Sequence, residues 1–113
     1  MANTNKITII GGAGKVGSTV AYALTLKELA SEIVLIDVRQ EQTEGEAMDI
    51  RQGTPFIGPV YVHAGDYNDA KNSDIVILTS GVGRKPGQTR LDLAQTNVNI
   101  MKSIIPQITK VAP

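Results

Sequence analysis

The residues best placed to do chemistry form a glycine-rich segment near the start of the chain. They stand between an apolar run and a helical pattern, in the order G-x-G-x-x-G: Gly12, Ala13, Gly14, Lys15, Val16 and Gly17. In such a turn the first glycine permits a tight bend, the second lets the backbone approach a pyrophosphate, and the third lets the helix lie close to the strand. Amides at the helix start then bond to phosphate oxygens. The motif predicts a dinucleotide site, whereas a P-loop triphosphatase is disfavoured because its G-x-x-x-x-G-K-[ST] pattern is missing from the sequence.

An acidic residue follows this motif at the distance where a dinucleotide site needs one. Asp37 ends the next apolar run, about 20 residues beyond Gly17, where a carboxylate accepts hydrogen bonds from the ribose hydroxyls of NAD and repels the 2′-phosphate of NADP. We therefore expect NAD as the cofactor, although Arg39 can soften that preference. The alternative is a glycine turn of purely structural use, followed by an aspartate that only ends a strand.

A second polar segment, residues 80–90, contains three glycines and a proline and has no apolar period, which is typical of a loop. It follows an apolar run, and the strand ends of a doubly wound sheet face the ligand crevice. Arg84 and Arg90 offer planar donor forks that suit carboxylates, and the glycines favour a loop that closes over a substrate. A solvated basic loop is the alternative.

Short apolar runs that alternate with helical patterns must position these residues. The runs are residues 7–10, 33–36, 60–63 and 75–78. Their alternation with helices predicts an α/β fold, a Rossmann-type doubly wound parallel sheet with crossover helices. Three runs are apolar nearly throughout, as strands covered on both faces are, whereas the run 60–63 alternates and predicts a half-exposed or edge strand.

Three helices are expected around these strands. The first has Val16, Val20, Ala23 and Leu24 at helical spacing, and the second, roughly residues 41–51, is mostly polar and is expected on the surface or against a partner chain. The third begins at about Leu91 and is expected to contain a kink at Pro106. Its apolar stripe is expected to be core: Leu91, Ala94, Val98, Met101, Ile105 and Ile108. Since no strand pattern follows this helix, we expect the chain to contain the first four strands of a Rossmann-type domain and to lack the last strands of that domain.

Composition excludes several classes of function. The 113 residues have a net charge of zero and 42% hydrophobic content, which describes one domain over residues 1–113 without the basic surface of a nucleic-acid binder. The apolar runs are far shorter than the about 20 residues of a membrane span. There is no cysteine and His63 is the single histidine, so a disulfide framework and a thiolate metal site are excluded. We expect a cytoplasmic protein without nucleic-acid, membrane or metal partners.

Taken together, these motifs resemble the lactate and malate dehydrogenases, and the likeness runs along essentially the whole chain. The matching segments are residues 9–17, 35–37, 45–50, 63–67 and 84–87, together with Arg90 and Asn97. The resemblance implies an NAD-dependent oxidoreductase that interconverts a 2-hydroxy acid and a 2-oxo acid.

The resemblance also implies roles for the matching residues at the cofactor. The glycine motif would hold the pyrophosphate, Asp37 would bind the adenosine ribose, and Asn97 would lie at the nicotinamide side. One further segment would pass its backbone beside the dinucleotide, and it consists of Thr79, Ser80, Gly81 and Val82.

At the substrate, Arg90 resembles the catalytic arginine of the mobile loop, which binds the substrate and polarises its C2 oxygen. Arg84 stands at the position that chooses the substrate, where arginine resembles the malate-specific members and lactate-specific members usually carry glutamine. Other segments, such as residues 63–67, are more similar to lactate dehydrogenases. Malate or oxaloacetate is therefore the favoured substrate, and L-lactate is the alternative.

The family's catalytic histidine, its aspartate partner and the arginine for the C1 carboxylate have no match among these residues, and His63 is no substitute. We therefore expect the 113 residues alone to be inactive. The resemblance implies that the full protein is a homo-oligomer, a dimer or tetramer, formed through the helix of residues 41–51. An alternative of another class is a noncatalytic dinucleotide-binding half-domain, which would use Asp37 but not Arg84 or Arg90.

Overall fold

Strands and helices alternate along the chain in the computed structural model, which describes residues 5–53, 60–79, 87 and 89–112. The strands are β1 (Lys6–Ile10), β2 (Glu32–Ile36), β3 (Tyr61–Ala64) and β4 (Ile75–Leu78). The helices are α1 (Lys15–Leu26), α2 (Gln40–Gly53) and α3 (Arg90–Val111), with a short 3₁₀ helix η1 (Tyr67–Ala70). Each predicted element is present within a few residues of its expected bounds.

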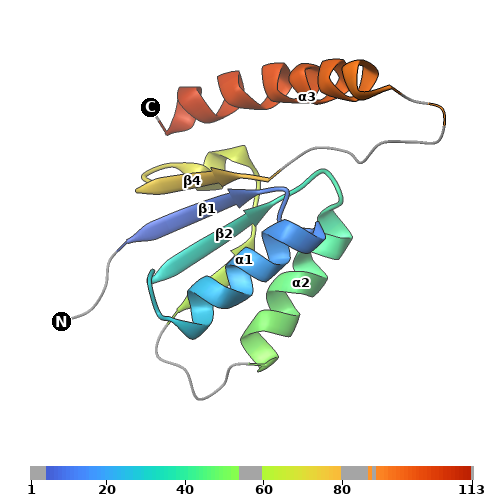
Figure 1. Ribbon diagram of the computed structural model, residues 1–113. Coiled ribbons are helices and arrows are strands. Elements are labelled where there is room, and N and C mark those ends of the chain that lie inside the picture. The colour runs from blue at the N-terminus through green and yellow to red at the C-terminus, as the bar shows by residue number, and fades with distance from the viewer. Residues whose placement is uncertain (1–4, 54–59, 80–86, 88, 113) are drawn as a thin grey trace.

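The strands form one parallel sheet in the order β3-β2-β1-β4. Helices α1 and α2 cover one face of this sheet and α3 lies over the other, so the molecule has three layers (Figure 1). The order reverses at β1, since the chain runs outward to β3 on one side and then crosses to β4 on the other. The predicted Rossmann-type, doubly wound topology is confirmed, and its ligand crevice is expected at this point of reversal.

Alternation along the inner strands divides the core between the two faces of the sheet. Ile9 and Leu35 are buried with Ala21 and Ala47 in the core beneath α1 and α2. The neighbouring strand residues Ile10, Val34 and Ile36 pack on the opposite face, in a second core with Ile104 of α3. Both faces of β1 and β2 are therefore buried, as their nearly continuous apolar sequences predict.

Of the two outer strands, β3 has the burial pattern that its sequence predicts and β4 does not. β3 is an edge strand with Val62 buried and Tyr61 exposed, as its alternating pattern predicts. β4 was expected to be covered on both faces, and this is wrong for the described residues, because none of its four residues is buried and Ile75 is 55% exposed. The reason is that β4 pairs only with β1 and lies at the other edge of the described sheet.

Helix α1 faces the sheet with small residues. Its buried positions, Gly17, Ala21 and Thr25, recur every four residues, and Thr25 donates its hydroxyl proton to the Ala21 carbonyl oxygen over 2.8 Å. The expected apolar face was partly wrong, since Val16 and Ala23 are exposed. Small side chains let the helix axis approach the strands closely, and this selects a different face from the one that hydrophobicity alone indicates.

Helix α3 also packs with a different stripe from the one expected. Ile104 is buried, and Ile100, Ile108 and Val111 pack with it against the sheet. Of the six expected core residues only Ile108 belongs to this contact, while Leu91 is 80% exposed. The helix is apolar on more than one side, so its period alone cannot determine which side faces the sheet. It continues through Pro106 to Val111.

Gly17 is the glycine whose replacement is expected to cost the most stability. A Cβ atom there would stand 2.3 Å from the Gly11 carbonyl oxygen and 2.9 Å from Thr79 Oγ1, so Gly17→Ala must push α1 off the sheet. We expect it to lower the free energy of unfolding by about 1–3 kcal/mol, measured by urea-induced unfolding of the native protein.

The matched control is Gly53→Ala, because a Cβ atom at Gly53 would meet nothing within 4 Å. That variant should change the free energy of unfolding by less than about 0.5 kcal/mol. Equal effects of the two substitutions would contradict the close approach of α1.

Candidate functional site

The glycine motif is attached to the ends of both neighbouring strands. The amides of Gly11 and Gly12 both donate to the Ile36 carbonyl oxygen, over 2.7 and 3.1 Å. On the other side, Thr79, the residue that follows β4, donates from its hydroxyl to the Ile10 carbonyl oxygen over 2.8 Å. The loop is thereby held at the carboxyl edge of the sheet, at the point where the strand order reverses.

The glycines of this loop serve different purposes. The motif predicts that its first glycine, Gly12, makes the tight bend. The structure differs, because the residue with the positive φ that favours glycine is Gly11, at +90°. Gly12 is needed for another reason, since a Cβ atom there would stand 2.7 Å from Leu35 Cβ. At Gly14 the nearest atoms would be 3.4 and 3.8 Å away, so the fold leaves space there that a ligand can use.

The start of α1 is open toward this space. Its N-cap is Gly14, which has no side chain to bond to the first amides, and no acidic residue stands in the first turn. Lys15 and Val16 begin the helix and are exposed. Helix amides without a side-chain cap, together with the positive end of the helix dipole, form a suitable seat for a phosphate.

Asp37 lies directly beside this loop, and its side chain is only 6% exposed. Its Oδ2 accepts from the Ala13 amide over 3.2 Å and from Arg39 Nη2 over 3.1 Å. Its Oδ1 accepts from the amide and Nε of Arg39 over 3.1 and 3.2 Å. Burial pushes the pKa of the Asp37 carboxyl upward, but these hydrogen bonds outweigh it and hold that pKa below its ordinary value. The side chain is therefore a carboxylate at neutral pH.

A cavity of about 770 Å³ opens between the glycine loop, the end of β2 and the middle of α3. Gly14, Asp37 and Thr79, three of the residues that the sequence singled out, line it together. Its wall includes the apolar side chains of Ile36 and Ile104. The arrangement joins an apolar space to a carboxylate and to the uncapped amides at the start of α1, which is the combination that a nucleoside with phosphates requires.

Other residues of this cavity were missed by the sequence interpretation. Tyr67 comes from η1, and burial followed by the charge of Asp37 raises its pKa. Four residues come from one face of α3: Ile100, Ser103, Ile104 and Gln107. Their spacing, i, i+3, i+4 and i+7, is a signal that the sequence contains. A neighbouring stripe of the same helix is more apolar, and hydrophobicity alone therefore favours the wrong face.

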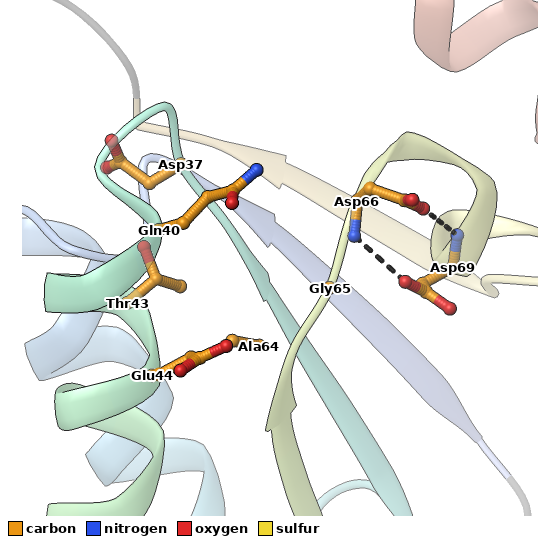
Figure 2. Close-up of a pocket in the computed structure, with 8 residues that line it drawn as sticks. All are labelled: Asp37, Gln40, Thr43, Glu44, Ala64, Gly65, Asp66 and Asp69. Carbon is orange, nitrogen blue, oxygen red and sulfur yellow. Dashed lines mark hydrogen bonds between the residues drawn. The ribbon is translucent and has the colours of Figure 1, made fainter.

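A smaller cavity of about 230 Å³ lies between α2 and the segment that joins β3 to η1. Its lining includes four carboxylates, those of Asp37, Glu44, Asp66 and Asp69. Figure 2 shows Asp66 and Asp69 engaged with each other's amides, where Asp69 Oδ2 accepts from the Asp66 amide over 2.8 Å. These two aspartates form a capping box at the start of η1, and we assign this cavity no ligand.

The remaining predicted site residues lie on α3 or outside the described ranges. Arg90 is the first residue of α3 and is exposed, and Asn97 is half-buried on the same helix, one turn before Ile100 of the larger cavity. The N-terminal part of α3 extends past the carboxyl ends of the strands (Figure 1). Ser80, Gly81, Val82 and Arg84 lie outside the described residues.

His63 has structural partners and lies away from this site. Its Nε2 is 2.7 Å from Glu32 Oε2, and its ring stacks on Tyr61 with a centroid distance of 4.4 Å. Within the described ranges, no group of three or more acidic, histidine or cysteine side chains has an arrangement that could hold a metal ion. No helix in the same ranges combines the length and apolar character needed to cross a membrane.

Comparison with known proteins also indicates a dinucleotide-binding domain. The family model described as lactate/malate dehydrogenase, NAD binding domain, matches residues 5–113. An L-lactate dehydrogenase of Clostridium botulinum is 56% identical over 108 residues, which are 96% of this chain and 34% of that relative. An L-lactate dehydrogenase of Clostridium perfringens is 54% identical over 97% of this chain and 34% of its own length.

Solved structures of both kinds of dehydrogenase superpose on the chain. The ligand-bound minor L-lactate dehydrogenase of Enterococcus mundtii has a TM-score of 0.90 and 43% identity, over 96% of this chain and 34% of its own. The apo malate dehydrogenase of Picrophilus torridus has a TM-score of 0.88 and 37% identity, over 96% and 35%. The chain thus spans about a third of the length of the curated relatives it matches. By its sequence, fold and glycine loop, it belongs to the family of lactate and malate dehydrogenase NAD-binding domains.

Proposed function

We propose that this chain is the cofactor-binding part of an NAD-dependent oxidoreductase that transfers a hydride between the cofactor and a 2-hydroxy acid. The observation that carries the proposal is the position of Asp37. Its carboxylate is nearly buried, is held by the Ala13 amide and stands between the apolar cavity and the open start of α1. A ribose acceptor, a base pocket and a phosphate seat are therefore adjacent.

The residues of the cavity fit the adenosine half of NAD. Its volume of about 770 Å³ is within the range of small-molecule sites, about 300–1,000 Å³. The isoleucines of α3 and β2 provide an apolar wall for the base, and Asp37 accepts from the ribose hydroxyls. Gly14 leaves the backbone accessible to the pyrophosphate. When bound, NAD supplies the hydride acceptor, and the residues described here bind and orient it.

For the substrate we propose malate or oxaloacetate, bound by two arginines. Arg90 would stabilise the negative charge that develops on the C2 oxygen, and its place at the start of α3 is on the side of the strand ends. Arg84 would pair with the second carboxylate of the substrate. L-lactate is the second candidate, and it is favoured by a specific observation, since the relatives that are 54–56% identical are named L-lactate dehydrogenases.

Two properties of the whole protein belong to the same proposal. We infer a homo-oligomer, a dimer or tetramer, through α2, because this helix is largely polar and yet presents Met48, which is 48% exposed. We infer a cytoplasmic location, for which a chain without cysteine is suited. A noncatalytic half-domain is the competing function, and it differs in having no use for Arg84 or Arg90.

The first prediction concerns the backbone at the phosphate seat. Gly14→Ala adds a methyl group whose nearest described neighbour is 3.4 Å away, so we expect the fold to tolerate it. The same methyl group stands between the backbone and the pyrophosphate. We expect the dissociation constant for NADH to rise at least about tenfold, equivalent to about 1.4 kcal/mol, in a fluorescence titration of the native protein.

Gly53→Ala is again the control, and it should leave NADH binding unchanged. If the midpoint of urea-induced unfolding is the same for both variants and the native protein, the substitutions leave the stability of the fold unchanged, and a weaker affinity for NADH then reports on binding alone. If Gly14→Ala bound NADH as tightly as the native protein does, the phosphate seat would be misplaced.

The second prediction concerns the choice of substrate. Arg84→Gln removes the partner of the second carboxylate, and an unpaired buried charge costs about 2–5 kcal/mol. The ratio of kcat/KM for oxaloacetate to kcat/KM for pyruvate should fall by about 30-fold to several thousand-fold. Steady-state kinetics of the full protein, of which the 113 residues would be the cofactor-binding part, measures this ratio with both substrates.

Arg90→Gln is the matched comparison, since Arg90 would act on the C2 oxygen that both substrates share. It should lower kcat for both substrates and leave the ratio nearly constant. An unchanged ratio in Arg84→Gln would remove the basis for malate, and the absence of turnover by the full protein with either substrate would favour the noncatalytic half-domain.

A further inference from the structure

The guanidinium group of Arg39 occupies the place where a ribose must approach Asp37. It forms a fork with the carboxylate, from Nε to Oδ1 and from Nη2 to Oδ2. Nη2 also lies only 3.8 Å from the position that a Cβ atom on Gly14 would take. Arg39 and Asp37 both line the larger cavity, so this ion pair stands between the base pocket and the phosphate seat.

The exposure of the two partners is unequal. The side chain of Arg39 is 52% exposed, whereas that of Asp37 is 6% exposed. The arginine is therefore free to turn toward a ligand while the aspartate stays in place. Asp37 would still keep the Ala13 amide and the Arg39 amide as donors, since these belong to the backbone.

The pair changes the electrostatics that a phosphate on the ribose would meet. A bare carboxylate repels a 2′-phosphate, and this repulsion is the usual basis for rejecting NADP. Here the carboxylate is already neutralised at a distance of 3.1 Å. Asp37 takes two of the N–H donors of the guanidinium group, and no other described residue takes one, so donors remain for an anion.

We propose that Arg39 is a specificity-determining residue that lets this site accept NADP(H) as a second cofactor beside NAD(H). With NAD, the ribose hydroxyls replace the guanidinium group at Asp37. With NADP, the guanidinium group stays beside Asp37 and its remaining donors bind the 2′-phosphate, as planar forks do well. This inference rests on the proposed function, since it requires that Asp37 receives the adenosine ribose.

The test compares dissociation constants for NADH and NADPH, measured by fluorescence titration of the native protein and of four variants, one of which is Asp37→Asn. Arg39→Gln should raise the dissociation constant for NADPH by about tenfold or more, the size of one hydrogen bond to a charged group, and should leave NADH binding equal or tighter. Arg39→Lys keeps the charge without the fork and should lie between. Lys27→Gln removes a charge at the far end of α1 and should leave the ratio unchanged.

Salt gives an independent measurement on the same samples. Because an exposed ion pair is screened, NADPH binding should weaken with added sodium chloride more steeply than NADH binding, and Arg39→Gln should remove that difference. Thermal unfolding of each variant at the native temperature verifies that the fold is retained.

The outcomes separate this inference from the function on which it rests. No measurable NADPH binding by the native protein, or equal loss of both cofactors in Arg39→Gln, overturns the role of Arg39 and leaves the NAD site intact. A failure of Asp37→Asn to weaken NADH overturns the placement of the ribose, and both proposals then fall. A selective loss of NADPH in Arg39→Gln with a matching loss of salt dependence supports the inference.

Discussion

The candidate cofactor site depends on one constraint, which is that two successive backbone amides donate to the same carbonyl oxygen. Gly11 and Gly12 both donate to Ile36, and this attaches the loop after β1 to the end of β2. As a result the Ala13 amide and the Asp37 carboxylate, which follow different strands, are within 3.2 Å of one another. The phosphate seat and the ribose acceptor are thereby fixed relative to each other by backbone contacts at strand ends, before any ligand is present.

The parts of this site that could be predicted are those with local causes. A glycine at a bend, an uncapped helix start and an acid at a strand end each follow from a few adjacent residues, so the motif and Asp37 were recognisable from the sequence. The parallel sheet was predictable for a related reason, since strands buried on both faces need continuous apolar runs. The position of Gly11 was less accessible, because adjacent glycines do not reveal which one takes a positive φ.

The parts that could not be predicted depend on contacts between distant elements. The face of α1 that meets the sheet is made of Gly17, Ala21 and Thr25, which are selected by closeness of approach and not by hydrophobicity. The face of α3 that meets the sheet is set by its packing against η1 and against residues of β1 and β2, and an apolar period on several sides of the helix leaves that face undetermined from the sequence. Four residues that line the larger cavity come from this face of α3, so the lining of the cavity could not be predicted from the sequence either.

Asp37 must satisfy two opposed requirements, and the structure divides them between different groups. It must be ionised to accept ribose hydroxyls, yet its burial by itself favours the neutral form. Backbone amides of Ala13 and Arg39 provide donors that no ligand needs to displace. The Arg39 side chain provides the rest, from a position exposed enough to be exchanged. Ionisation of Asp37 and access for the cofactor are therefore compatible, because the compensating charge is on a side chain that can move away.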